Sequence, residues 1–230
     1  MANNIETINF KTSDNVIIVG DYFKTADPKA PAVLLLHMMP ADRFSWTELA
    51  KKLQQNGFQC LAIDLRGHGE SRDQNGKHLN YRNFSDLEHQ SSKFDVDRSV
   101  KFFIEKGIKL ENISIIGASI GANLALDFAV GHNEIKAVVL LSPGLNYRGI
   151  LTEPLAKNLK GDDGQSVFMA ATYGDEYSAD SVKKLSKIIP KGVKKEIKIL
   201  EGKAHGTDMF EENLNLENEL ISWLKFIYFK

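Results

Sequence analysis

Short, uninterrupted apolar segments alternate with segments of helical periodicity along most of this chain, and no other feature restricts its fold as strongly. Apolar runs of this length are typical of strands buried on both faces of a parallel sheet. Strands that alternate with helices predict βαβ units, and therefore a mostly parallel sheet with helices on both faces. The predicted strands cover residues 32–36, 60–63, 113–116, 137–141, 167–171 and 197–200, and the predicted helices cover 45–56, 93–106, 119–131, 179–189 and 214–228.

The N-terminal residues alternate between apolar and polar side chains, a pattern that predicts an antiparallel hairpin of residues 6–12 and 16–23. Ser13, Asp14 and Asn15 supply the turn between the two strands. With this hairpin we expect an α/β fold whose sheet has about eight strands. A chain of 230 residues fits one domain of this class, so we expect residues 1–230 to form a single domain.

Two segments, 67–92 and 142–165, interrupt the alternation and are rich in residues that favour turns. Each follows a predicted strand, so both are expected at the carboxyl edge of the sheet, where open α/β sheets bind ligands. Connections of this length are frequently functional. The second segment is long enough for a small lid insertion with one or two short helices.

Composition restricts the partners and the compartment. The 29 basic and 30 acidic residues give a net charge of −1, which does not support a nucleic-acid partner. Cys60 is the single cysteine, so no disulfide within the chain is expected, and its apolar surroundings predict a buried side chain. No signal peptide is evident, and no apolar run approaches the roughly 20 residues that span a bilayer. We therefore expect a cytoplasmic protein without stable membrane insertion; its oligomeric state stays open.

Residues 117–121 read Gly-Ala-Ser-Ile-Gly and join a predicted strand to a predicted helix. Gly-x-Ser-x-Gly in this context is typical of a nucleophile elbow, a tight turn that exposes the serine hydroxyl above the sheet. The flanking glycines fit because they carry no Cβ. The alternative is a plain tight turn whose Ser119 caps the helix. The first interpretation requires an acid and then a histidine, each after a later strand.

His205 is the histidine that follows the last predicted strand, and it is the candidate general base. Asp175 follows residues 167–171 closely and comes directly after a glycine, so it is the favoured acid that would orient the imidazole. Glu176 is an alternative acid, and Asp208 is a weaker one. The order Ser119, Asp175, His205 is the order that this type of elbow requires.

An acyl-transfer site also needs backbone N–H donors for the developing oxyanion. Ile120, directly after the nucleophile, is expected to supply one, and Met39 the other, with Met38 as the second choice. No metal and no cofactor are implied. The apolar residues near these loops that we expect to line a substrate pocket are Met38, Leu145, Tyr147 and Met209.

With these motifs the sequence resembles the α/β-hydrolase superfamily, and most of all its small cap-less bacterial carboxylesterase and dienelactone-hydrolase-like members. Residues 34–37 (Leu-Leu-Leu-His) and 64–71 (Asp-Leu-Arg-Gly-His-Gly-Glu-Ser) match further family motifs. The resemblance implies that His37, Arg66 and His68 are structural. Two departures stand out: Met38 replaces the usual glycine after the histidine, and a serine replaces the cysteine of dienelactone hydrolases.

The resemblance implies a serine hydrolase that cleaves a carboxylic ester or thioester with a small or apolar acyl group. The reaction would proceed through an acyl-enzyme, and the partner would be a small molecule. The main alternative is a ligand-binding protein that keeps the fold but turns over slowly. An inert scaffold and a peptidase are further alternatives.

Overall fold

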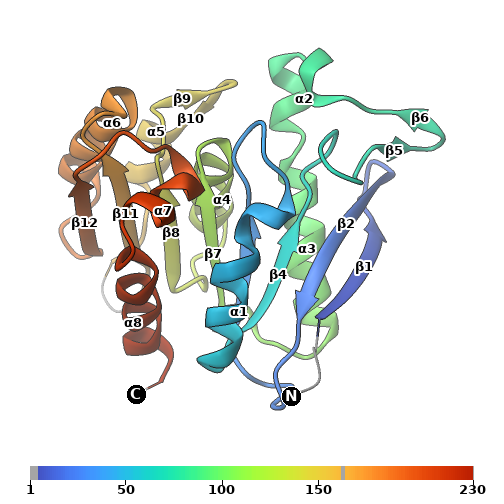
Figure 1. Ribbon diagram of the computed structural model, residues 1–230, viewed down its shortest axis with the longest axis horizontal. Helices are drawn as coiled ribbons and strands as arrows, with labels where there is room; N and C mark the ends of the chain where they lie inside the picture. The colour runs from blue at the N-terminus through green and yellow to red at the C-terminus, as the bar shows by residue number, and fades with distance from the viewer. Residues whose placement is uncertain (1–4, 162–163, 230) are drawn as a thin grey trace.

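The computed structural model describes residues 5–161 and 164–229. The first four residues, on which the expectation about a signal peptide partly rests, lie outside the described residues, as do two positions of segment 142–165. The chain is built around a ten-stranded sheet in the order β12-β11-β8-β7-β3-β4-β2-β5-β6, with β1 paired to β2 (Figure 1). Its strands are β1 (Ile5–Lys11), β2 (Val16–Phe23), β3 (Ala32–Leu36), β4 (Gln59–Ile63), β5 (Asp73–Gln74), β6 (Lys77–His78), β7 (Ile113–Ala118), β8 (Ala137–Leu141), β11 (Ser166–Thr172) and β12 (Lys194–Leu200).

Six neighbouring strands pair in parallel, namely β12, β11, β8, β7, β3 and β4. The pairings that involve β1, β2, β5 and β6 are antiparallel. The expected mostly parallel sheet with an N-terminal hairpin is therefore confirmed. Eight strands have five or more residues, in line with the predicted number, and the two-residue strands β5 and β6 bring the total to ten. Because β3, β7 and β8 are neighbours, the loops that follow them meet at one edge of the sheet.

Helices cover both faces of the sheet, as expected. Helices α3 (Lys93–Glu105), α4 (Ile120–Gly131), α5 (Thr152–Lys157) and α6 (Glu176–Ile188) pack in one core cluster with side chains of alternate strand positions such as Leu34 and Leu36. Helices α1 (Thr47–Gln55), α7 (Met209–Glu212) and α8 (Leu216–Tyr228) pack in a second cluster with the intervening positions, such as Val33 and Leu35. None of the helices in the described part of the chain is long and apolar enough to cross a membrane.

The two long segments contain short elements. Segment 67–92 holds β5, β6 and α2 (Asp86–Gln90), together with a 3₁₀ turn, η2 (Tyr81–Asn83). Segment 142–165 holds the two-stranded hairpin of β9 (Asn146–Tyr147) and β10 (Ile150–Leu151), followed by α5. Both lie at the upper edge of the sheet in Figure 1, where β9 and β10 project above β8. The remaining 3₁₀ turns are η1 (Arg43–Trp46), η3 (Leu110–Asn112) and η4 (Gly206–Asp208).

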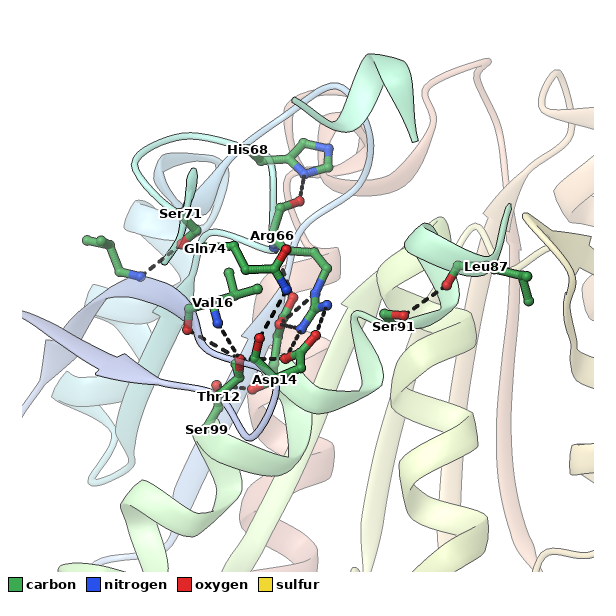
Figure 2. A network of polar contacts seen from close by, with 12 residues as sticks. Thr12, Asp14, Val16, Arg66, His68, Ser71, Gln74, Leu87, Ser91 and Ser99 are labelled. Carbon is green, nitrogen blue, oxygen red and sulfur yellow. Dashed lines mark hydrogen bonds and ion pairs between the residues drawn. The ribbon is translucent and has the colours of Figure 1, made fainter. Parts of the chain in front are cut away.

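Arg66 ties the loop after β4 to its surroundings, as Figure 2 shows for its contact with Asp14. Its guanidinium donates to Asp14 at 2.6 Å and to the fully buried Asp95 at 2.8 Å, and its amide donates to Asp95 at 2.9 Å. Gln74 adds a bond to the Asp14 carbonyl. This network joins the N-terminal hairpin to α3.

His37 anchors the loop after β3. Its Nδ1–H donates to the Met38 carbonyl at 2.8 Å, so its Nε2 is left to accept the Leu65 amide at 3.0 Å. The ring is fully buried and stands edge-on to that of His68, which stacks on Tyr81. Burial lowers the pKa of His37, in keeping with a neutral ring. Both histidines therefore hold neighbouring loops together.

Candidate active site

Ser119 occupies a sharp turn between β7 and α4. Its backbone has φ 55° and ψ −120°, outside the regions that residues other than glycine usually adopt. Its amide donates to the Leu141 carbonyl at 2.8 Å, which fixes the turn against β8. No hydrogen bond from its side chain caps α4, so the structure does not support the alternative of a helix-capping serine. The side chain lies at the end of β7 with the residue 8% exposed.

The two flanking glycines sit where no side chain would fit. A Cβ at Gly117 would lie 2.0 Å from the carbonyl oxygen of Gly121, because the strand and helix approach each other so closely. A Cβ at Gly121 would lie 2.3 Å from the Leu36 carbonyl oxygen. The motif is therefore required by the packing of α4 against β7 and β3.

His205 and Asp175 meet at the same edge of the sheet, although 30 residues separate them. His205 lies between β12 and η4, and its Nδ1 is 2.7 Å from Oδ2 of Asp175, which follows β11. The His205 side chain is 34% exposed and that of Asp175 is 14% exposed. The two alternative acids, Glu176 and Asp208, are both exposed.

Hydrogen bonds keep the Asp175 carboxylate ionised. Burial alone would raise its pKa, but bonds from His205 and from the hydroxyls of Ser178 and Ser142 outweigh that effect, and the pKa lies below its usual value. Ser142 is fully buried, follows β8 with φ 48°, and also accepts the amide of Gly206 at 2.9 Å. It thereby joins the loop of the histidine to the carboxylate.

The amides that we expect to face an oxyanion lie in two adjacent loops. Ile120 is the first residue of α4, so its N–H belongs to the helix end that has no intrahelical acceptor. Met39 lies in the loop after β3, before a cis peptide bond to Pro40. The Met38 side chain is 9% exposed and turns towards the loop after His205, where its sulfur lies 3.9 Å from Oγ1 of Thr207.

The four expected pocket residues divide between the two core clusters. Met38 and Met209 belong to the core cluster of α1, α7 and α8, and Met209 is fully buried. Leu145 and Tyr147 are partly buried and pack on the other cluster, beside α4. Leu145 also lines a cavity of about 590 Å³ with Leu151 of β10 and residues 153, 154, 157 and 158.

Our sequence interpretation missed three residues that organise this site. Ser142 and Ser178 lower the pKa of Asp175, and Asn123 of α4 binds the backbone of segment 142–165. The position of Ser178, three residues after the candidate acid and therefore one helical turn on, was a usable signal. Among residues 5–161 and 164–229 no group of three or more His, Cys, Asp or Glu side chains could hold a metal ion.

Comparison with known proteins shows the family of the chain. Residues 31–185 match the model of the family described as the alpha/beta hydrolase fold. A Bacillus subtilis protein named as a 2-succinyl-6-hydroxy-2,4-cyclohexadiene-1-carboxylate synthase is 33% identical over 160 residues, which cover 67% of this chain and 52% of that protein. A monoacylglycerol lipase of Xenopus laevis is 28% identical over 63% of this chain and 41% of its own. The chain thus spans about half the length, or less, of these two relatives.

Solved structures with low sequence identity share the whole fold. An esterase of Pyrococcus furiosus superposes with a TM-score of 0.76 at 17% identity, covering 97% of this chain and 91% of that one. An acetyl xylan esterase from Paenibacillus sp. R4 gives 0.75 at 17% identity, covering 96% and 83% of the two chains. A thioesterase domain from the curacin biosynthetic pathway gives 0.70 at 15% identity, covering 97% and 100%.

Proposed function

Because the chain belongs to the alpha/beta hydrolase family, we propose that it is a serine esterase that cleaves a carboxylic ester, or a thioester, of a small or apolar acyl group. The observation that carries this proposal is the 2.7 Å hydrogen bond between His205 and Asp175, at the sheet edge where Ser119 occupies its strained turn. Residues 1–230 would act as one domain, with segment 142–165 as a small lid.

In the proposed mechanism Ser119 attacks the carbonyl carbon while His205 takes the hydroxyl proton. Asp175 holds the imidazole in the tautomer that accepts this proton and stabilises the imidazolium that forms. The amides of Ile120 and Met39 bind the oxyanion of the tetrahedral intermediate. His205 then protonates the leaving group, and water releases the acyl group from Ser119 by the same steps.

The names of the matched relatives do not select one reaction, since they include a synthase and a lipase. The structural neighbours named as esterases and as a thioesterase support acyl transfer at the level of the fold. Leu145 and Tyr147, which belong to the proposed lid segment, would contact the substrate. Met38 and Met209 would not contact the substrate directly. Their packing in the core would support the loops that carry Met39 and His205.

Labelling with a fluorophosphonate probe tests the proposal, with Ser119→Ala as the control and p-nitrophenyl esters of rising acyl length as substrates. We expect wild type to be labelled and to turn over short esters, and the variant to do neither. Turnover that declines along the series would define the length of the acyl pocket.

If folded wild type stays unlabelled, the proposal that the protein is a serine esterase is contradicted. In that case the alternative, a binding protein with slow turnover, would be tested by whether an intact ester stays bound without release of product.

A further inference from the structure

Tyr147 lies beside His205, one of the candidate catalytic residues. It ends β9, and its ring stands edge-on to that of His205, with the centroids 6.4 Å apart and the planes at 89°. Its hydroxyl oxygen is 3.3 Å from Oγ of Ser178. Burial raises the pKa of Tyr147, against the opposing effect of the hydroxyls of Ser178 and Ser119, so the phenol stays protonated at neutral pH.

The position of the Tyr147 ring is determined by packing. A Cβ on Gly144 would lie 2.6 Å from this ring, so only a glycine leaves room for it there. The ring of Tyr177 packs against it in an edge-on arrangement at 5.7 Å, and the Tyr177 hydroxyl accepts the Asn146 amide at 2.9 Å. The phenol is therefore held over the site by neighbours on α6 and in its own hairpin.

The hydroxyl of Tyr147 is a hydrogen-bond donor that can exchange Ser178 for another acceptor with little loss of free energy. At 3.3 Å its contact with Ser178 is longer than the 2.5–3.0 Å usual for hydrogen bonds between hydroxyls, so the bond is weak. The Ser178 oxygen can accept from the phenol, since a hydroxyl carries two acceptor lone pairs beside its donor. A negatively charged oxygen placed nearby would be a stronger acceptor than Ser178.

Such an oxygen arises in the reaction proposed above. The leaving-group oxygen must lie within reach of His205, because the imidazolium protonates it. It must also lie next to Ser119, whose oxygen is bonded to the same carbon. The ring of Tyr147 stands edge-on to that of His205, and its hydroxyl reaches Ser178 in the first turn after Asp175, so this side chain borders the same space.

We propose that Tyr147 is a further catalytic residue, which donates a hydrogen bond to the leaving-group oxygen of the ester; this role rests on the proposed function. When the bond between the carbonyl carbon and this oxygen breaks, the electron pair stays on the oxygen and the proton comes from His205. Tyr147 keeps its own proton and stabilises the partial negative charge of the transition state. The site is thereby suited to unactivated alkyl esters, whose leaving oxygen develops the most charge.

The test compares kcat/KM, which reports the acylation step, for ethyl acetate and for p-nitrophenyl acetate in wild type and Tyr147→Phe. Loss of a hydrogen bond to a charged oxygen should lower kcat/KM for the ethyl ester about tenfold to hundredfold. The aryl ester, whose leaving group needs little assistance, should lose much less, and fluorophosphonate labelling should continue. Tyr173→Phe, which removes the hydroxyl of an exposed tyrosine near the site, is the matched control and should leave both esters unaffected.

Gly144→Ala provides a second variant, since its Cβ would displace the ring rather than remove the hydroxyl. It should reproduce the selective loss on the ethyl ester, with folding checked by circular dichroism. If folded Tyr147→Phe loses kcat/KM equally for both esters, or for neither, the proposed role of Tyr147 is overturned. The proposal that the protein is an esterase would still stand. A wild type that hydrolyses neither ester would overturn the esterase and this role with it.

Discussion

Asp175 is hydrogen-bonded to the imidazole of His205, and the hydroxyls of Ser178 and Ser142 help to lower its pKa, whereas its neighbour Glu176 is exposed. Asp175→Asn would keep the shape of the side chain but could hold His205 in the wrong tautomer and would not stabilise the imidazolium. We expect kcat to fall by about 10⁴-fold, the loss that this change causes in a serine protease. The measurement is steady-state hydrolysis of p-nitrophenyl acetate.

Glu176→Gln is the control for this prediction and should leave kcat nearly unchanged. A comparable loss in both variants would contradict the assignment of the acid. The sequence was sufficient to favour Asp175, because the residue follows a predicted strand and a glycine. It was not sufficient for Ser142, whose bond from the Gly206 amide exists only when β8, β11 and β12 lie side by side.

At the scale of elements, the junction of β7 and α4 leaves little room for a larger side chain. A Cβ at Gly121 would lie 2.3 Å from a backbone oxygen of β3, so Gly121→Ala must move the helix or the strand. We expect the free energy of unfolding to fall by about 1–3 kcal/mol or more, together with a loss of fluorophosphonate labelling. Urea denaturation followed by circular dichroism measures the first effect.

Gly131, at the other end of the same helix, is the matched control because a Cβ there would meet nothing within 4 Å. Gly131→Ala should raise the free energy of unfolding by up to about 1 kcal/mol, through the lower entropy of the unfolded chain. A larger loss for Gly131→Ala than for Gly121→Ala would show that the close approach at the elbow is not what limits substitution.

The success of the sequence interpretation differed between elements for physical reasons. Strands β2, β3 and β8 begin and end where their apolar patterns predicted. Helix α6 begins at Glu176 rather than at residue 179. The start was missed because the first turn holds the exposed Glu176 and Tyr177 and the small buried Ser178, which show no apolar periodicity. The two-residue strand β5 exists through its pairing with β2, which no local pattern encodes.

At the scale of the whole molecule, buried neutral histidines link stability to pH. Burial, with a smaller effect of neighbouring His37, lowers the pKa of His68 to about 3. The unfolded chain takes up this proton near pH 6.5, whereas the folded chain does so only near pH 3. The folded state therefore loses stability as the pH falls through this window, by about 1.4 kcal/mol per pH unit for this one histidine.

His68→Asn isolates this contribution, because it removes the proton site while other groups continue to titrate. Asp95, whose pKa burial raises to about 6, acts in the opposite sense between its folded and unfolded values. We expect urea denaturation from pH 7 to pH 4 to show a shallower loss of stability in the variant than in wild type. Parallel curves for the two proteins would mean that His68 is protonated to the same extent in the folded and unfolded chains.

Asn123 sits in the helix that follows Ser119, yet its amide group binds the backbone of Gly144, which precedes β9, and of Ile150, which begins β10. The residues between these anchors are fastened from other sides, since the amides of Leu145 and Asn146 donate to hydroxyls of α6 and Gln90 of α2 donates to the Arg148 carbonyl. We therefore expect changes in residues 145–149 to require matching changes in α2 and α6, whereas α4 need not change. Replacements that keep Tyr147 could admit different esters, and the way in which the nucleophile is presented would be inherited unchanged.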